Sequence, residues 1–466
     1  MRYVSTRGLA PTVGFGDVLL NGLAPDGGLY VPDRWPRFTP AEIAALRGLP
    51  YPELVAAVSA PFVDETIADL RGIAGDAYAT FDRLVPLTDL GGGLWLLELF
   101  WGPTLAFKDY ALQLLGRLFD TSLTERHRRA LVLGATSGDT GSAAIEACRD
   151  RAALDIVILH PHERISEVQR RQMTTVPSAN VHNLAVRGTF DDCQRLVKEM
   201  LADPSLRSEF GVTSVNSINW VRIMAQVAYY FAAALTLGAP EREVTFSVPT
   251  GNFGNVFAAY VARRMGLPVR RLIIGTNRNN VVARFLETGE LSIDTVVPTI
   301  TPAMDIQVPS NLERLLFDLH DRDGRPIRLL MAAFAEQGWV KVDPTRLEEL
   351  GSFVTARWFD EPAIRRVLTG IHRETSVLVD PHTAVGIAAA RATEREPDVP
   401  VICIGTAHPA KFPDAVATAT GVRPRLPERL SDLFDRPEIM TVLPADRRVV
   451  EGFVRRVVPP GRGEDE

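Results

Sequence analysis

Residues 130–148, ALVLGATSGDTGSAAIEAC, contain the pattern that indicates the fold class. The apolar run 130–133 predicts a buried strand, and a helix is predicted from about Asp139, after a turn rich in glycine and hydroxyl groups. The same order of strand, turn and helix recurs along the chain, with further strands predicted at 94–100, 155–159, 181–186, 244–248, 269–275 and 399–404. Such a chain is expected to form an α/β fold, with parallel sheets covered by helices on both faces.

The composition is that of an ordinary water-soluble globular chain. Of its 466 residues, 46% are apolar and 23% charged, which excludes disorder, collagen-like repeats and a disulfide scaffold. The net charge of −6 comes from 51 basic and 57 acidic side chains mixed along the sequence, so no surface for nucleic acid is expected. The uncharged stretch 223–238 is shorter than the roughly 20 apolar residues that cross a bilayer, and it predicts a buried helix rather than a membrane span.

The cysteines and the first residues indicate the compartment. Cys148, Cys193 and Cys403 are too few and too scattered for a disulfide framework, so a reducing compartment, by default the cytoplasm, is expected. Residues 1–13 lack the unbroken apolar segment of a secretion signal. The histidines show no spacing typical of metal ligands, and no metal site is expected.

The turn at residues 102–109, GPTLAFKD, follows an apolar strand and begins a helix. Lys108 therefore lies at a strand-to-helix junction, where burial and the positive end of the helix dipole both lower the pKa of its amine. A neutral amine is a nucleophile for carbonyl carbon atoms. Taken alone, Lys108 could also be a surface lysine paired with Asp109.

A second turn, GATSGDTG at residues 134–141, brings three hydroxyl groups and backbone N–H groups to a helix N-terminus. The hydroxyls belong to Thr136, Ser137 and Thr140, and together these groups suit a carboxylate or a phosphate. The turn lacks the lysine of a nucleotide-binding P-loop. An ordinary N-capping loop is the alternative.

A third turn, PTGNFGN at residues 249–255, joins a strand to the next helix. Gly251 and Gly254 allow close approach of the backbone and Asn252 and Asn255 add amides, so the turn suits a phosphate monoester. The glycine spacing does not fit a dinucleotide-binding turn, which disfavours NAD. A tight turn would explain the glycines equally well.

A fourth turn, GTAHPAKF at residues 405–412, follows the strand VICI. Thr406 can present a hydroxyl at the end of that strand. His408 and Lys411 are expected to have structural roles or to face solvent, rather than to contact a ligand. Ligands of parallel sheets bind at the carboxyl ends of strands, where these turns lie.

A strand-end lysine, an anion loop and a phosphate site are the parts that hold pyridoxal phosphate as a Schiff base. The blocks GPTLAFKDYALQLLG, ATSGDTGSAA, NSIN, PTGNFGN and IGTAHPAKF, in this order, resemble threonine synthases of the longer-chain kind, as do STRG and GLYVP near the start. The resemblance extends to about Val416. It implies the fold of the tryptophan synthase β-chain group, with two parallel-sheet three-layer α/β domains and the cofactor between them.

The same resemblance places the expected boundaries. An N-terminal subdomain of helices and turns is expected at 1–85, and an α/β domain with Lys108 and the ATSGDTG loop at 86–235. A second α/β domain, with the GNFGN loop and Thr406, is expected at 236–425. Residues 426–466 are expected to form a C-terminal extension.

The resemblance also implies which residues bind pyridoxal 5'-phosphate. Lys108 would form the Schiff base, and Thr406 would bond the pyridine nitrogen as a neutral hydroxyl. Asp139 stands where many relatives of this fold place an asparagine beside the cofactor's 3-oxygen, and two anions there repel each other unless one is protonated. The cofactor phosphate would be held by the loop of Gly251, Asn252, Phe253, Gly254 and Asn255.

The implied substrate is O-phospho-L-homoserine, a small molecule, and no obligate protein partner is indicated. Thr136, Ser137 and Thr140 would bind its carboxylate. Its phosphate would be bound by Asn216, Ser217 and Arg222, of which Arg222 can form two parallel N–H bonds with a phosphate. Taken without the resemblance, Arg222 would be read as a helix-surface arginine.

The implied reaction makes the chain a carbon–oxygen lyase of threonine biosynthesis. O-phospho-L-homoserine and water become L-threonine and phosphate, by elimination of phosphate from Cγ and addition of water at Cβ, with Lys108 moving the protons. A serine or threonine dehydratase, or a lyase that stops at the 2-oxo acid, is the nearest alternative. A non-catalytic binding protein is a further one, against which the intact Lys108 and 251–255 blocks argue.

Overall fold

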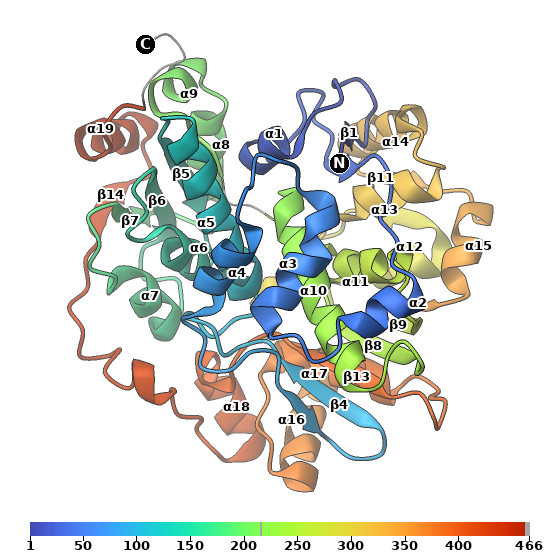
Figure 1. The fold of residues 1–466 in the computed structure, drawn as a ribbon. Coiled ribbons are helices and arrows are strands. Elements are labelled where there is room, and N and C mark those ends of the chain that lie inside the picture. Colours follow the sequence, from blue (N-terminus) through green and yellow to red (C-terminus); the bar gives the residue numbers. More distant parts are fainter. Residues whose placement is uncertain (215–216, 462–466) are drawn as a thin grey trace.

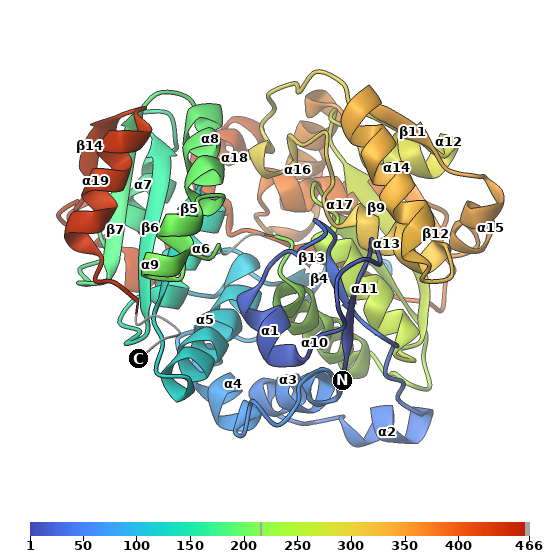
Figure 2. The ribbon, with the colours of Figure 1, turned by 90° about the horizontal axis from the view of Figure 1, so that it is seen from above.

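Two sheets make up the frame of the molecule, which a computed structural model describes for residues 1–214 and 217–461 (Figures 1 and 2). The larger has the order β12-β9-β8-β13-β4-β3 and is parallel except at β3, which pairs antiparallel with β4. Its strands, in that order, are Val354–Trp358, Val269–Thr276, Val244–Pro249, Val401–Gly405, Leu94–Glu98 and Leu87–Asp89.

The smaller sheet is parallel throughout, in the order β14-β7-β6-β5. Its strands are Thr441–Pro444, Val181–Arg187, Leu154–Pro161 and Ala130–Ala135. Two antiparallel pairs lie outside the sheets, β1 (Tyr3–Ser5) with β2 (Tyr30–Pro32) and β10 (Glu290–Ser292) with β11 (Trp339–Lys341). Every strand predicted from the sequence is present, with ends within two residues of those expected.

Both faces of each sheet are covered, as consecutive residues of one strand show. In β13, Ile402 and Ile404 join the main apolar core with the N-terminal layer, whereas Cys403 faces a second core with the helices behind the sheet. In β5, Val132 faces the main core and Leu131 a third core under the outer helices. Burial on both faces favours the nearly continuous apolar strands seen in the sequence.

The helices divide among these layers (Figure 2). Those of the N-terminal layer are α1 (Phe15–Leu20), α2 (Pro40–Ala45), α3 (Tyr51–Ser59) and α4 (Leu70–Tyr78). Those associated with the smaller sheet are α5 (Lys108–Glu125), α6 (Asp139–Cys148), α7 (Glu167–Thr174), α8 (Phe190–Leu201), α9 (Pro204–Phe210) and α19 (Arg447–Val457). The remaining helices are α10 (Trp220–Thr236), α11 (Gly254–Arg264), α12 (Val281–Thr288), α13 (Leu312–Leu319), α14 (Gly324–Gln337), α15 (Thr345–Gly351), α16 (Glu361–Thr375), α17 (Pro381–Arg391) and α18 (Pro413–Thr420).

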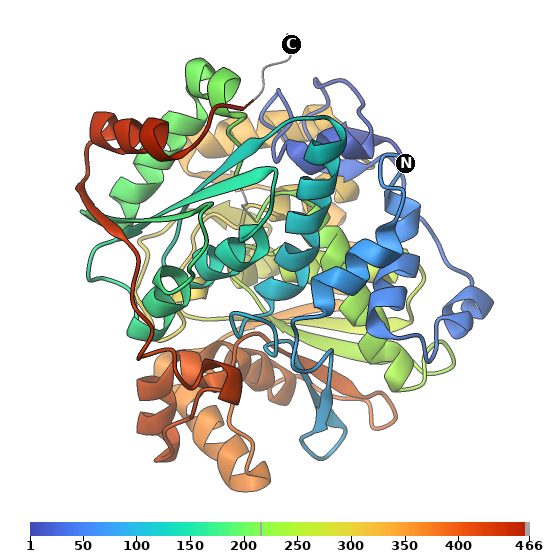
Figure 3. The same ribbon diagram turned by 60° about the vertical axis from the view of Figure 1, so that its left-hand side comes forward.

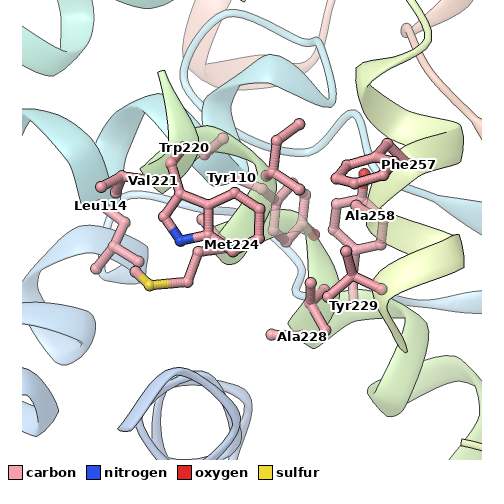
Figure 4. Packing of buried hydrophobic residues seen from close by; sticks show 14 of the residues in the cluster. Tyr110, Leu114, Trp220, Val221, Met224, Ala228, Tyr229, Phe257 and Ala258 are labelled. Atoms are coloured by element: carbon pink, nitrogen blue, oxygen red, sulfur yellow. The ribbon is translucent and has the colours of Figure 1, made fainter. Parts of the chain in front are cut away.

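Helix α10 lies at the centre of the main apolar core. Its residues are buried from Trp220 to Leu235, which confirms the buried helix predicted for this stretch. Trp220 packs on Tyr3 and Phe62 of the N-terminal layer, and Figure 4 shows it beside Leu114 of α5. Among the described residues, no helix is both long and apolar enough to cross a bilayer.

Sheet membership corrects two of the expected boundaries. Strand β4, inside the expected 86–235 domain, belongs to the larger sheet, where it pairs with β13. Strand β14, inside the expected 426–466 extension, pairs with β7 and completes the smaller sheet. Figure 3 shows the chain after α18 running along the outside of this sheet to α19. The physical reason is that strand pairing is non-local, so position in the sequence does not decide it.

Candidate active site

The carboxyl ends of β8 and β13 and the turn after β4 meet at one pocket. All four turns singled out from the sequence contribute lining residues to it, the 134–141 turn through Asp139. The pocket is lined by Phe107, Lys108, Asp139, Pro249, Thr250, Gly251, Asn252, Asn255, Ala303, Met304, His382, Thr406 and Ala407. This is the position that parallel sheets favour for a ligand.

The Lys108 turn is held to the end of β13 by backbone hydrogen bonds. The N–H of Phe107 donates to the carbonyl of Thr406 at 2.9 Å, and the N–H of His408 donates to the carbonyl of Leu105 at 3.0 Å. Leu105 adopts a left-handed conformation with φ of 61°, an uncommon one for a residue with a side chain. The tertiary contacts therefore impose this turn, which places Lys108 at the first residue of α5.

Asp109 closes the same turn instead of pairing with Lys108. Its carboxylate accepts from the N–H of Thr104 at 2.8 Å and from Oγ1 of Thr104 at 2.6 Å. Complete burial raises the pKa of Asp109 to about 6, although these bonds and Lys411 oppose the rise. The alternative of a surface lysine paired with Asp109 is therefore wrong, because Lys108 is only 12% exposed and faces another carboxylate.

That carboxylate is Asp139, which two lysines share. Oδ2 of Asp139 lies 3.3 Å from Nζ of Lys108, and Oδ1 lies 2.9 Å from Nζ of Lys411. Burial opposes the charge of Asp139, but Lys411 and Lys108 outweigh it and hold the pKa of Asp139 far below its ordinary value. Burial lowers the pKa of Lys108, as the sequence predicts, with Asp139 opposing the shift and Lys411 adding to it.

The loop 134–141 is organised by one of its own hydroxyls. Oγ1 of Thr136 accepts from the N–H groups of Gly138 and Gly141 at 3.0 and 2.9 Å, so this buried oxygen closes the loop. Gly138 has a φ of 143°, which favours glycine. Ser137 is exposed and Thr140 half-buried. Contact of Thr136, Ser137 and Thr140 with a carboxylate stays a prediction.

The loop of Gly251 to Asn255 forms one wall of the pocket at the start of α11. Gly251 has no room for a side chain, because a Cβ would lie 2.9 Å from the carbonyl oxygen of Ala303. Phe253 is left-handed, with φ of 68°. Oδ1 of Asn255 accepts from the hydroxyls of Tyr229 and Tyr230, which leaves its buried Nδ2 without a partner among the described residues. A buried donor beside a helix N-terminus suits an anion.

Thr406 and His382 lie across the pocket. Oγ1 of Thr406 is buried and has no partner in residues 1–214 and 217–461, so a hydroxyl is free to bond a ligand there. The N–H of Thr406 donates to Oγ1 of Thr383 at 3.0 Å. Nδ1 of His382 lies 2.7 Å from Oδ2 of Asp380, and its Nε2 accepts from the N–H of Ala303 at 3.3 Å. The imidazole therefore fixes the pocket wall.

The proposed substrate-phosphate residues begin helix α10. Arg222 is buried, with 4% of its surface exposed, and its Nε and Nη1 have no partner within the described residues. Burial lowers its pKa to about 10. Oγ of Ser217 lies 3.3 Å from Oγ of Ser310. Asn216 lies outside the described residues. The expectation of a helix-surface arginine is wrong, because α10 is buried in the core.

Lys411 is the main residue that the sequence prediction missed. The sequence predicts a structural role or exposure to solvent for it, and the structure shows it fully buried and in contact with Asp139. His382, Asp380 and Gln169 were not singled out either, and no local motif marks them. A signal for Lys411 does exist, since the 466 residues contain only four lysines and two of them lie in the pocket turns. Within the described ranges no cluster of His, Cys, Asp or Glu is placed to hold a metal ion.

Comparison with known families agrees with this geometry. Residues 2–78 match the family model described as "Threonine synthase N terminus", and residues 383–454 match "Threonine synthase, C-terminal". Between them, residues 80–332 match "Pyridoxal-phosphate dependent enzyme". A threonine synthase of Pseudomonas aeruginosa is 53% identical over 97% of this chain and 98% of its own. The chain belongs to the threonine synthase family.

Solved structures of threonine synthases support the fold as well as the family. The pyridoxal-phosphate-bound enzyme of Brucella melitensis is 48% identical, with a TM-score of 0.97 over 98% of this chain and 99% of that one. The yeast enzyme is 36% identical, with a TM-score of 0.93 over 98% of each chain. The predicted resemblance and the α/β fold are confirmed.

The residues present fit pyridoxal phosphate. The pocket offers an amine of lowered pKa in Lys108, a hydroxyl of Thr406 that has no partner in the described part of the chain, and a buried amide donor in Asn255 at a helix N-terminus. These three groups match the aldehyde, the ring nitrogen and the phosphate of the cofactor in chemical type. Threonine synthases are pyridoxal-phosphate enzymes, and the predicted cofactor is confirmed by the family match.

Proposed function

We propose that this chain converts O-phospho-L-homoserine and water into L-threonine and phosphate, and that Lys108 is its catalytic residue. The observation that carries the proposal is the place of Lys108: its Nζ enters a pocket whose other walls are Thr406, the 251–255 loop and Asp139. When bound, pyridoxal phosphate supplies an aldehyde and an electron-withdrawing ring that acidifies the neighbouring C–H bonds of an amino acid. The match to threonine synthases along the whole chain supports this substrate.

Lys108 is proposed to bind the cofactor aldehyde and then to move protons. Once the amino acid takes its place, Nζ of Lys108 is free to remove the proton from Cα of the substrate. A second proton leaves Cβ as phosphate leaves Cγ with the electron pair of the C–O bond. Cγ is then protonated, water adds at Cβ, and a proton returns to Cα. The lowered pKa of Lys108 favours this use as a base near neutral pH.

The other site residues are proposed to bind and orient. Thr406 bonds the ring nitrogen, and the loop of Gly251 to Asn255 holds the cofactor phosphate. Asp139 lies beside Lys108, at a distance of 3.3 Å from its Nζ. The substrate carboxylate is assigned to the 134–141 loop at the start of α6, where the helix dipole favours an anion.

The substrate phosphate is assigned to Arg222, with Ser217 and Asn216 as its neighbours in sequence. A buried guanidinium with two nitrogens that lack a partner among the described residues is costly unless an anion comes to it. Its charge also acts on Lys108, lowering the pKa of that amine. A phosphate on Arg222 would thus stand near the base that acts on Cα.

We further propose a cytoplasmic location and no obligate protein partner. All three cysteines, Cys148, Cys193 and Cys403, are free and buried, which supports a reducing compartment.

Product analysis of the purified protein with pyridoxal phosphate and O-phospho-L-homoserine tests the function. We expect threonine and phosphate in equal amounts; 2-oxobutyrate as the main product would instead support a lyase, and no product a binding protein. K108A should abolish turnover, whereas K198A, at an exposed lysine of α8, should not. After borohydride reduction, the mass of the cofactor should be found on the peptide that contains Lys108. Its attachment elsewhere would overturn the assignment.

A further inference from the structure

Lysine is rare in this chain, and its placement is uneven. Of 51 basic side chains, four are lysines: Lys108, Lys198, Lys341 and Lys411. Lys198 and Lys341 are exposed, whereas Lys108 and Lys411 both contact Asp139. Arginine provides the rest of the positive charge, so a lysine at position 411 indicates a need for a compact ammonium group there.

Lys411 has two oxygen atoms of the protein as partners. It is fully buried in the 3₁₀ turn Pro409–Lys411, and its Nζ donates to Oδ1 of Asp139 at 2.9 Å and to the carbonyl oxygen of Thr104 at 2.7 Å. Removing an ammonium group from water costs several kcal/mol, which only close partners offset. A cation this deeply buried is held for a purpose other than solubility.

The two oxygens of Asp139 have different neighbours. Oδ1 accepts from Lys411 and from Nε2 of Gln169, at 2.9 and 2.8 Å. Oδ2 faces Nζ of Lys108 at 3.3 Å. The carboxylate is therefore fixed through one oxygen while the other is directed at the amine in the pocket.

We propose that Lys411 is a positioning residue: it keeps Asp139 ionised and directed at Lys108 throughout the reaction, including the steps in which Lys108 carries no charge. The inference rests on the proposed function, in which Lys108 gives up its proton. Without Lys411, Asp139 would then be a buried anion with no cation in contact. With Lys411, its charge stays compensated, and Lys108 can gain or lose a proton without a matching change at Asp139.

The other charged groups around this pair are consistent with that assignment. The charge of Lys411 lowers the pKa of Asp109 in α5, and the charge of Arg222 in α10 lowers the pKa of Lys108. Burial lowers the pKa of His408, which precedes the Lys411 turn, to about 4, so this imidazole is neutral at pH 7. Lys411 is thus the cation that contacts the fixed oxygen of Asp139.

The test follows the protonation of each lysine in the full chain. Labelling with lysine carrying ¹³C at Cε gives few NMR signals, because there are four lysines, and the signal of Lys108 is assigned with K108A. Replacing Lys411 by methionine removes a like charge near Lys108 and leaves its ammonium as the remaining cation on Asp139. We expect K411M to raise the titration midpoint of Lys108 by about one pH unit or more. K411R keeps the charge in a bulkier group and should shift the midpoint less than K411M does, whereas K198M and K341M should leave it unchanged.

Two further variants distinguish the positioning role of Lys411 from a general loss of folding. K411Q keeps a hydrogen-bond donor without the charge, and it replaces K411M in the test if K411M does not fold. K411Q should shift the titration midpoint of Lys108 in the same direction. In the D139N background, K411M should have a smaller effect, because the proposed action passes through the carboxylate. In the cofactor-loaded enzyme, the alkaline shift should reappear in the pH profile of kcat/KM.

The possible outcomes test the role of Lys411 separately from the proposed formation of threonine. An unchanged or lowered Lys108 midpoint in both K411M and K411Q, with normal threonine formation by the wild type, would reject the role of Lys411 alone. A shifted midpoint in a protein that forms no threonine would reject the proposed function and keep the charge arrangement. An effect equally large with and without D139N would overturn the role of Asp139 as the link.

Discussion

Arg222 is a buried cation that has no anionic partner among the described residues. Two of its guanidinium nitrogens have no partner within the described residues, and burial lowers its pKa to about 10. Such a group lowers the stability of the fold, and proteins keep groups of this kind where function needs them.

The R222A variant is therefore expected to separate stability from binding. KM for O-phospho-L-homoserine should rise about 100-fold, since a charge-assisted pair contributes up to roughly 3 kcal/mol. The free energy of unfolding in urea should stay unchanged or increase, because an unpaired buried charge is removed. R222K keeps the charge without the paired N–H groups, so its KM should lie between those of the wild type and R222A. An unchanged KM in R222A would contradict the phosphate assignment.

Asp109 contributes to the stability of the fold in a pH-dependent way, and the sign is opposite to that usual for a carboxylate. Its pKa of about 6 in the folded chain exceeds the ordinary 3.8, so the folded state binds the proton more tightly than the unfolded state does. Stability from this residue is thus present at low pH and is lost as the pH rises from about 4 to about 6.

Comparison of the wild type with D109N isolates this effect. The wild type should lose up to roughly 3 kcal/mol of unfolding free energy relative to D109N between about pH 3 and about pH 7, at 1.36 kcal/mol per pKa unit, most of it between pH 4 and pH 6. Above about pH 7 the difference should be constant. Urea unfolding at a series of pH values measures it, and a difference that grows in the opposite direction would exclude the raised pKa.

At the scale of elements, α19 attaches the end of the chain to the smaller sheet. Its buried residues Val450, Phe453 and Val454 join the core under α8, whereas neighbouring Val449 is 41% exposed. We expect V450A to lower the free energy of unfolding by about 2 kcal/mol and V449A to change it by less than about 0.5 kcal/mol. Equal effects of the two variants in urea unfolding would show that α19 is not docked as described.

Most strands of both sheets could be predicted from local pattern, because buried parallel strands are short apolar runs followed by turn residues. Strands β3, β12 and β14 could not, since each is only partly buried and lies at a sheet edge. The sheet to which β4 belongs also depends on a partner, β13, some 300 residues later. The local sequence pattern predicts a strand, but not the strands with which it pairs.

The same limit applies to the site. Lys108, Thr406 and the 251–255 loop lie in turns whose local chemistry is visible in the sequence, and the structure brings them to one pocket. For Lys411, which follows the residues AHPA, the sequence predicts only a structural role or exposure, and its burial depends on contact with Asp139. Its role is a tertiary property that no local window contains.

At the scale of the whole molecule, the C-terminal segment reaches the Lys108 turn. Nη1 of Arg429 donates to the carbonyl of Pro103 at 2.9 Å, Nη2 donates to that of Gly102, and Nε donates to Asp82 at 2.6 Å. This guanidinium binds the start of the turn that positions Lys108, from more than 300 residues away.

We therefore expect R429A to impair catalysis from a distance. Loss of these bonds should lower the free energy of unfolding by about 2 kcal/mol and kcat/KM about tenfold, through a less rigid turn. R425A, at an exposed arginine of the same segment, is the matched control. A loss of activity in both variants, or in neither, would contradict the role of Arg429.

Strand β14 has one more consequence, for the order of assembly. The edge of β7 gains its neighbour only when residues 441–444 have been synthesised, after the whole larger sheet. During translation that edge is an open template for pairing with other chains. A chain cut after α18 should accept a separate peptide of residues 422–461 by strand addition, so the missing edge could be restored by complementation in trans.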